Sequence, residues 1–406
     1  MKKPTLRGSV SEPLRTLAAL LLVMGAGYFF MGDLMGGTLF RHHYWDSYTL
    51  QTWNWFQGRT WIAEPEKYEY LELAIYQGKY YLSFPPLPSV VLVPFVAAFG
   101  MDTPSNLIVA LYGLASAALA YFIMLRRGRT PAVSAFWALV CVWGCNMMFM
   151  TTIGGVWFQA QALNMVMCLA AVLCALDGRK ALATTFLALA VGCRPLSAIF
   201  LPVFAFLFAW NEREERGGFW KSCLAQWKCV VGPILIGACY MVYNYVRFDN
   251  PLEFGHNYLP EFVRAEHGQF HWSYLLPNLK QMVLTPVKFA DGRLSFPLFQ
   301  GFMFFVANPL FVVWFVRCGR NAAKKRVSAE GLTIAVGVVS MLLLTCMHRT
   351  LGSWQFGSRY SCDALPFVYM YLADRSPRRA ANWELALGGL AVAFNVYGAM
   401  YMYMYG

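Results

Sequence analysis

Two carboxylates in a polar segment near the N-terminus are the residues best suited to chemistry. The segment spans residues 33–87 and carries six carboxylates, which are Asp33, Asp46, Glu64, Glu66, Glu69 and Glu72. A general base must be ionised and must lie within hydrogen-bond reach of the hydroxyl that it deprotonates. A carboxylate at the water boundary of a membrane meets both conditions, so Asp46 is our first candidate for a base and Glu72 the second.

Each of these carboxylates also has a purely structural interpretation. Asp46 stands just before Ser47-Tyr48-Thr49 and is a good N-cap for a short helix. Glu72 precedes Lys79 by seven residues and is suited to a surface ion pair with it. Both interpretations remain open beside the catalytic ones.

The elements that must position these residues are membrane helices. Of the 406 residues, 58% are apolar and 13% are charged, and the mean hydropathy is +0.44. These values are typical of integral membrane proteins. A helix that crosses about 30 Å of hydrocarbon needs about 20 apolar residues. We predict an all-α polytopic fold with about eleven spans, near residues 16–32, 103–125, 132–150, 158–176, 181–193, 196–210, 229–246, 298–316, 331–347, 361–373 and 383–402.

The net charge of +12 is distributed unequally between the two sides of this topology. The N-terminus and the alternate loops after it hold 21 basic residues (Lys and Arg) and 8 acidic residues (Asp and Glu). The loops on the opposite side hold 12 basic and 13 acidic residues. Such a bias marks the cytoplasmic side. We therefore expect the N-terminus inside and the C-terminus outside, and we interpret the basic runs as membrane anchors that bind no nucleic acid.

We expect one membrane domain, residues 1–406, with two large outer loops that form a cap, 33–102 and 247–297. In the first loop, Gly78 and Lys79 punctuate two strand-like pieces. Prolines 85, 86 and 88 end these pieces before an apolar stretch of about a dozen residues, which is too short to span a bilayer. That stretch is suited to a helix that lies in the membrane interface.

The spans themselves are nearly free of ionisable groups, and only Asp363 and Glu384 lie within a turn of span ends. Coupled carriers usually place carboxylates near the midplane, so this pattern disfavours them. No glycine-rich phosphate loop is present to bind a nucleotide. A lipid-linked glycan flippase or transporter, and a non-catalytic membrane protein of envelope assembly, remain the alternatives to an enzyme.

Histidines and tryptophans collect on the predicted outer side. All six histidines fall there, as do four tryptophans of the first loop: His42, His43, His256, His267, His271, His348, Trp45, Trp53, Trp55 and Trp61. The aromatic residues either stack on sugar rings or form an interfacial belt. His267 and His271 have a spacing that suits a metal on a helix, but Gly268 intervenes and further ligands are missing, so we assign no metal and no cofactor.

Five groups of residues along the chain together resemble a known family. They are Asp46, Tyr48, Gly58 and Arg59; Glu72 with GKYY (78–81) and FPPLP (84–88); VGCRP (191–195); YNYVRFDNPLEFGHNY (243–258); and QFGSRYSCDALPF (355–367). In this order they resemble the bacterial GT-C glycosyltransferases, polytopic enzymes that use polyprenyl-phosphate sugars, and among these the protein mannosyltransferase group.

The resemblance implies transfer of a sugar from a polyprenyl-phosphate donor to an acceptor hydroxyl at the outer face of a bacterial inner membrane. The acceptor would be a glycan, lipid or protein of the cell envelope. Asp46 and Glu72 would be the catalytic carboxylates. The donor phosphate would be bound by Arg359, Arg194, Arg247 and Arg349, and other substrate groups by Tyr48, Lys79, Tyr80, Tyr81 and Asp363.

The four arginines all lie at outer ends of predicted spans, where an arginine side chain either binds a ligand or extends to the interface. Arg359 lies in the tight sequence Gly357-Ser-Arg-Tyr and precedes Asp363 by four residues, which would place both on one face of a helix. The planar guanidinium fork matches the geometry of a phosphate. Arg359 and Arg194 are therefore the leading candidates for binding the phosphate.

Overall fold

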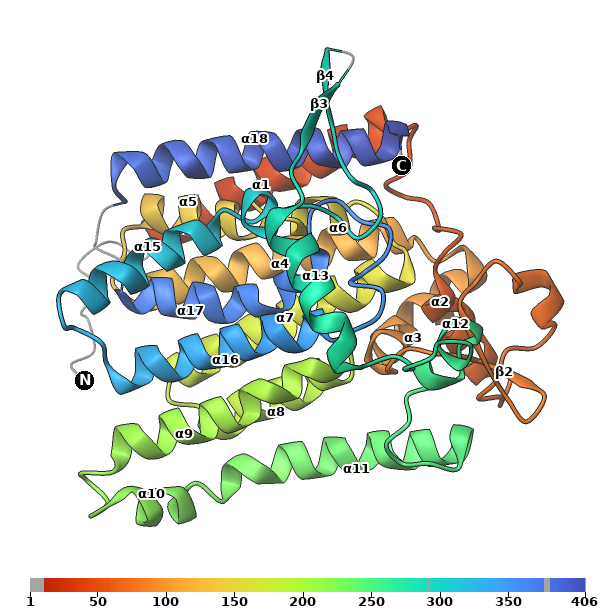
Figure 1. Cartoon of the computed structure of the whole chain (residues 1–406), viewed down its shortest axis with the longest axis horizontal. Coiled ribbons are helices and arrows are strands. Elements are labelled where there is room, and N and C mark those ends of the chain that lie inside the picture. The colour runs from red at the N-terminus through yellow and green to blue at the C-terminus, as the bar shows by residue number, and fades with distance from the viewer. Residues whose placement is uncertain (1–10, 291, 376–379, 406) are drawn as a thin grey trace.

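A computed structural model describes residues 11–290, 292–375 and 380–405, and it is mostly helical (Figure 1). Seven of its helical segments are long and apolar enough to cross a membrane. They are α1 (Ser11–Leu34), α4 (Ser105–Arg126), α7 (Val156–Leu176), η3 (Pro195–Ile199) continued by α9 (Phe200–Glu212), α11 (Lys228–Phe248), α16 (Ala329–Cys346) and α18 (Asn382–Tyr405).

The other four predicted spans hold shorter helices: α5 (Pro131–Val142), α8 (Lys180–Val191), α15 (Leu310–Ala323) and α17 (Leu365–Arg375). Each predicted span therefore coincides with a helix. Since only seven helices of the described residues have the length of a crossing, the count of about eleven crossings stays a prediction.

Polar side chains break two of the predicted spans. In the stretch 132–150, a turn that contains Asn146 separates α5 from α6 (Met147–Met150), and Asn308 separates α14 (Phe304–Ala307) from α15. The backbone N–H of Asn146 donates to Oδ1 of Asn308 at 2.9 Å, and Nδ2 of Asn308 donates to Oδ1 of Asn146 at 2.6 Å. These bonds satisfy backbone and amide groups that the helix breaks leave free, a pairing that apolar composition alone does not predict.

The helices form layers, with α7 inside and α11 at the periphery (Figure 1). Of the most apolar stretch of α7, 67% is buried, compared with 11% for α11. α7 packs against α4 and α8, whereas α11 packs on α8 and exposes Ile234, Leu235 and Val242. A helix with so large an exposed apolar face is suited to contact with lipid.

The first loop contains α2 (Ser47–Phe56), η1 (Pro65–Tyr68), β1 (Leu73–Tyr76), β2 (Lys79–Leu82), α3 (Leu87–Phe99) and η2 (Gly100–Asp102). The two predicted strands are confirmed as an antiparallel hairpin in which Leu73 pairs with Leu82 and Tyr76 with Lys79. The two residues of its turn, Gln77 and Gly78, both have positive φ values. This conformation is the one that a type I′ turn requires. The position of α3 at a membrane interface stays a prediction.

The second loop is built from short elements. Its elements are η4 (His256–Tyr258), α12 (Pro260–Val263), η5 (Trp272–Tyr274), α13 (Leu275–Leu284), β3 (Lys288–Ala290) and β4 (Arg293–Ser295). Its α12 lies with α2 and α3 of the first loop at one end of the bundle, whereas α13 crosses the middle of the bundle and the hairpin β3–β4 projects from another side (Figure 1). The remaining short elements are α10 (Phe219–Ala225) and η6 (Arg359–Ala364). The hairpin β1–β2 was predicted within the first loop, and the hairpin β3–β4 is the departure from the predicted all-α fold.

Gly357 allows the loop before Arg359 to pack closely, and we predict that Gly357→Ala destabilises the protein. Its φ is +65°, and an added Cβ would overlap Ala307 and lie 2.6 Å from Nδ2 of Asn146. A left-handed conformation alone costs about 1–2 kcal/mol for an alanine, so the free energy of unfolding should fall by about 2 kcal/mol or more.

Gly319→Ala is the matched control, because an added Cβ there meets nothing within 4 Å and the residue lies in α15. This variant should match or slightly exceed the parent in stability. Thermal unfolding of the purified proteins in detergent measures both effects. Equal melting temperatures for the two alanine variants would contradict the prediction.

Candidate functional site

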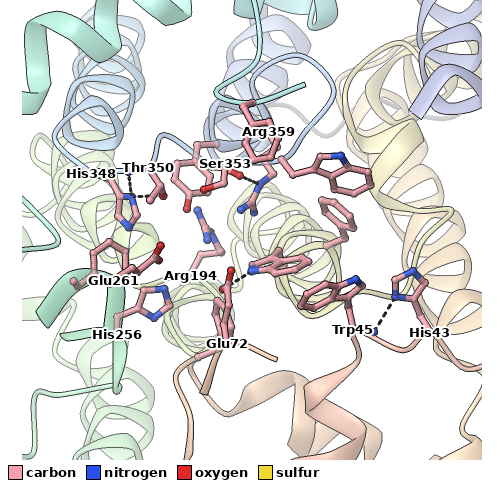
Figure 2. A pocket seen from close by; sticks show the side chains of 18 of the residues that line it. His43, Trp45, Glu72, Arg194, His256, Glu261, His348, Thr350, Ser353 and Arg359 are labelled. Atoms are coloured by element: carbon pink, nitrogen blue, oxygen red, sulfur yellow. Dashed lines mark hydrogen bonds between the residues drawn. The ribbon is translucent and has the colours of Figure 1, made fainter. Parts of the chain in front are cut away.

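A cavity of about 510 Å³ lies where the N-terminal end of α7 meets both loops (Figure 2). Its walls come from segments far apart in the sequence and combine charged, aromatic and small polar groups. The lining residues are His43, Tyr44, Trp45, Glu72, Phe84, Trp157, Phe158, Arg194, His256, Glu261, Phe262, Phe299, His348, Thr350, Gly352, Ser353, Trp354, Arg359 and Tyr360.

Arg194 and Arg359, the two leading candidates for binding phosphate, both line this cavity. Their guanidinium carbons lie 4.5 Å and 4.7 Å from the centre of the Tyr360 ring, so a single aromatic ring contacts both cations. Arg194 follows α8, and its Nε donates to Oδ2 of Asp363 at 2.9 Å. Asp363, a predicted substrate contact, therefore lies behind the cavity wall as the partner of Arg194.

Arg359 is held by neutral groups. Its Nε donates to the Gly352 carbonyl and its Nη1 to Oε1 of Gln161, each at 3.0 Å. In the described part of the chain its Nη2 has no hydrogen-bond partner. Gln161 also donates to Oδ1 of Asp363 at 3.2 Å. The prediction that Arg359 and Asp363 lie on one face of a helix is wrong, because η6 is a 3₁₀ helix with three residues per turn. Asp363 bonds Arg194.

Glu72 is the predicted catalytic carboxylate that lines the cavity. Its Oε2 accepts a hydrogen bond from Nε1 of Trp157 at 2.8 Å. Burial raises the pKa of Glu72 and so does the charge of Glu261, while the Trp157 hydrogen bond and the charge of Arg359 act in the opposite direction. A carboxylate with a raised pKa beside a cavity is suited to accept a proton from a bound hydroxyl.

Asp46 occupies a different position, because it is the N-cap of α2 and does not line the cavity. Its Oδ1 accepts hydrogen bonds from the Thr49 backbone at 3.1 Å and from Nε2 of Gln159 at 2.6 Å, and its Oδ2 accepts one from the Thr49 hydroxyl at 2.6 Å. Burial raises the pKa of Asp46, against the opposing effects of His42 and these hydrogen bonds. The geometry of Asp46 is therefore that of a helix N-cap, as in its structural interpretation. It does not support Asp46 as the first candidate for the base.

Two further predicted residues, Tyr48 and Arg247, are buried away from the cavity. Tyr48 packs its ring near Phe84. Arg247 donates to the Leu82 carbonyl at 2.8 Å and to Oδ1 of Asn244 at 3.1 Å, and it ties α11 to the first loop. Protein groups thus hold the guanidinium of Arg247, while its Nε and the Tyr48 hydroxyl have no hydrogen-bond partner within the described residues.

The remaining predicted residues do not line the cavity. Arg349 donates to the backbone carbonyl of Glu261. Lys79 is exposed, and its Nζ lies 4.3 Å from the centre of the Trp61 ring. The predicted ion pair between Lys79 and Glu72 is therefore wrong. Tyr80 faces a neighbouring hollow and Tyr81 packs on Phe248.

The residues that sequence reasoning did not assign to the site are mostly aromatic, histidine or small polar residues. His43, His256 and His348 line the cavity. Burial lowers the pKa of His43 and of His256 to about 4, and it lowers that of His348 well below the ordinary value. The collection of all histidines on one predicted side was the available signal. Trp157 has no such signal, because tryptophan is common throughout membrane proteins.

Solved structures of two proteins have a similar arrangement of helices. ArnT from Cupriavidus metallidurans bound to undecaprenyl phosphate aligns with a TM-score of 0.54 and 15% identity, over 95% of this chain and 64% of that chain. The Archaeoglobus fulgidus oligosaccharyltransferase in the apo form aligns with a TM-score of 0.55 and 14% identity, over 98% of this chain and 56% of that chain. The chain has a GT-C-like fold.

This GT-C-like chain spans about 64% and 56% of the lengths of those two proteins. No protein-family model and no curated protein sequence matches it. At these identities the likeness shows the arrangement of helices, so the chemistry must be argued from the cavity itself.

The Arg194–Asp363 pair supports the cavity wall, and both side chains are largely buried. We predict that Asp363→Ala lowers the free energy of unfolding by about 3 kcal/mol, because a buried cation would lose its partner. Replacing both residues, as Arg194→Met with Asp363→Leu, should restore most of the loss. Reversible unfolding in detergent micelles measures both. A double variant less stable than the single one would contradict this prediction.

Proposed function

We propose that this protein transfers a sugar from a polyprenyl-phosphate donor to an acceptor hydroxyl at the outer face of a bacterial inner membrane. The observation that carries the proposal is that Arg194, Arg359 and Glu72 line one cavity in a GT-C-like bundle. A phosphate site and a proton acceptor are the two groups that this reaction requires. The bound undecaprenyl phosphate of the ArnT structure supports a lipid phosphate as the donor.

In this proposal Arg194 and Arg359 bind the donor phosphate. The Nη2 of Arg359 has no partner in the described residues, and Arg194 reaches the same cavity from the end of α8. Of these two arginines, only Arg194 has a carboxylate of the described residues at hydrogen-bond distance, that of Asp363. The remaining positive charge stabilises the phosphate most in the transition state, because negative charge builds on the phosphate oxygen as the sugar leaves.

Glu72 replaces Asp46 as our first choice of base, since it lines the cavity and Asp46 does not. Glu72 would take the proton of the acceptor hydroxyl as the hydroxyl oxygen forms a bond to the anomeric carbon. The bond between that carbon and the phosphate oxygen breaks, and the electron pair leaves with the polyprenyl phosphate. The products are the glycosylated acceptor, polyprenyl phosphate and protonated Glu72.

The basic connections and the cavity lie at opposite ends of the bundle. The connections between α9 and α10 and between α15 and α16 lie at the end away from α2 and α12, whereas the C-terminal end of α18 lies on their side (Figure 1). Together with the positive-inside bias, this arrangement supports a cytoplasmic N-terminus and an external C-terminus.

We predict that Arg359→Lys weakens donor use by about tenfold or more, because lysine keeps the charge but loses the planar fork. The donor KM should rise while the folded protein remains abundant. Arg349→Lys is the control, since Arg349 lies off the cavity, and it should behave as the parent. An unchanged donor KM in Arg359→Lys would remove Arg359 from the phosphate site.

We predict that Glu72→Gln lowers the transfer rate by about 10²- to 10⁴-fold, the usual loss when a general base is removed. Asp46→Asn should retain most of the activity, because asparagine is an equally good N-cap. In the parent, transfer should fall as the pH decreases through the raised pKa of Glu72, since only the ionised carboxylate accepts a proton.

The residual activity of Glu72→Gln should lack this acid limb. Rate–pH profiles of the parent and both amide variants measure the effect. If instead Asp46→Asn were the inactive variant, with normal abundance, Glu72 would lose the role of base.

A reporter that is active only outside the cytoplasm, fused after Gly406, should be active, because the proposed topology places the C-terminus outside. The same reporter inserted at the connection between α9 and α10, after Gly217, should be inactive. Activity only at the second position would reverse the orientation and place the cavity at the cytoplasmic face.

A further inference from the structure

The hydrogen bonds of the cavity histidines determine which ring nitrogen carries the proton. Nδ1 of His256 lies 2.6 Å from the backbone carbonyl oxygen of Ser83. A carbonyl oxygen can only accept, so this Nδ1 carries a hydrogen and donates it. In the neutral ring, Nε2 then has a lone pair and acts as an acceptor.

His43 has the opposite tautomer. Its Nδ1 accepts from the backbone N–H of Trp45 at 3.3 Å, so its neutral ring carries the hydrogen on Nε2. In His348, Nδ1 accepts from the backbone N–H of Thr350 at 3.2 Å, and Nε2 lies 3.2 Å from the amide nitrogen of Gln269. Among the three histidines that line the cavity, His256 alone presents at Nε2 an acceptor that has no partner in the described residues.

The His256 ring is held rigidly and stays neutral. Phe84 meets it edge-on at 4.9 Å, and Phe262 lies nearly parallel to it at 5.8 Å between ring centres. Burial lowers the pKa of His256 to about 4, and the charges of Arg194 and Arg359 act in the same direction. Within the described residues its Nε2 has no hydrogen-bond partner.

Glu72 and Glu261 line the same cavity (Figure 2). Their ionised carboxylates also only accept hydrogen bonds. Both residues line a neighbouring hollow of about 450 Å³ as well, whose described lining includes Glu66 and Glu69 but no Lys or Arg. The cavity thus offers two chemically different kinds of groups. Arg194 and Arg359 supply donors and positive charge, whereas His256, Glu72 and Glu261 supply acceptors.

We propose that His256 is a specificity-determining residue that, with Glu72 and Glu261, accepts hydrogen bonds from hydroxyl or amino groups of the transferred sugar. This inference rests on the proposed glycosyl transfer. Every sugar hydroxyl can donate to Nε2, whereas phosphate and carboxylate oxygens have only lone pairs to offer. The site therefore selects neutral or amino sugars over uronic acids, and His256 does not bind the phosphate.

The test compares lipids that differ only in the sugar. Full-length protein in nanodiscs is titrated with undecaprenyl phosphate, with its glucose, galactose and mannose esters, and with its glucuronic acid ester. In the parent, at least one neutral hexose should increase affinity over the bare lipid, and the glucuronic acid ester should bind more weakly than the glucose ester.

His256→Phe keeps the ring packing and removes both nitrogens. It should reduce the gain from the hexose by about 3- to 10-fold, as expected for one lost neutral hydrogen bond.

Two controls separate recognition from packing. The affinity of His256→Phe for bare undecaprenyl phosphate should equal that of the parent, because the arginines are intact. His348→Phe removes a cavity histidine whose Nε2 already lies against the Gln269 amide, and it should leave the gain from the hexose unchanged.

Three outcomes would overturn the inference and leave the proposed function standing: no hexose improves binding in the parent, the gain is equal in the parent and His256→Phe, or both histidine variants lose it equally. Failure of the parent to bind bare undecaprenyl phosphate would instead overturn the proposed function.

Discussion

The placement of two arginine side chains over one aromatic ring is the constraint on which the rest of the site depends. Arg194 and Arg359 lie against Tyr360, and a single carboxylate of the described residues, that of Asp363, is hydrogen-bonded to them. Burying a cation without a counter-ion is costly. Arg359 therefore keeps a positive charge that no carboxylate at hydrogen-bond distance neutralises within the described residues, and an anionic ligand would neutralise it. Its neutral partners, Gly352 and Gln161, hold the guanidinium in place.

Keeping those charges in position requires irregular backbone inside an otherwise helical bundle. The breaks at Asn146 and Asn308, the left-handed Gly357 and the 3₁₀ helix η6 all lie in or beside the segment that carries Arg359. Such irregular backbone is tolerated at membrane depth only where protein groups satisfy it or where it lines a cavity. Here both conditions hold, because asparagine amides bond the breaks and η6 begins at a cavity residue.

The helices and part of the site could be predicted from the sequence, because each depends on local pattern. Apolar stretches located the helices, and the position of Arg194 and Arg359 at the ends of apolar stretches identified two cavity residues. Asp46 could not be told from Glu72, since an N-cap and a base need the same carboxylate. Nor could His256 be assigned, because its tautomer is determined by the Ser83 carbonyl 173 residues away.

Locating the phosphate of bound undecaprenyl phosphate in an experimental structure of the full-length protein would test the central claim most directly. The account predicts that the phosphate lies in the cavity, with its oxygens within hydrogen-bond distance of Nη2 of Arg359 and of the Arg194 guanidinium. Glu72 should lie on the side of the phosphate where the sugar of the donor and the acceptor hydroxyl would meet. A phosphate bound at Arg247 or Arg349, with the cavity empty, would contradict it.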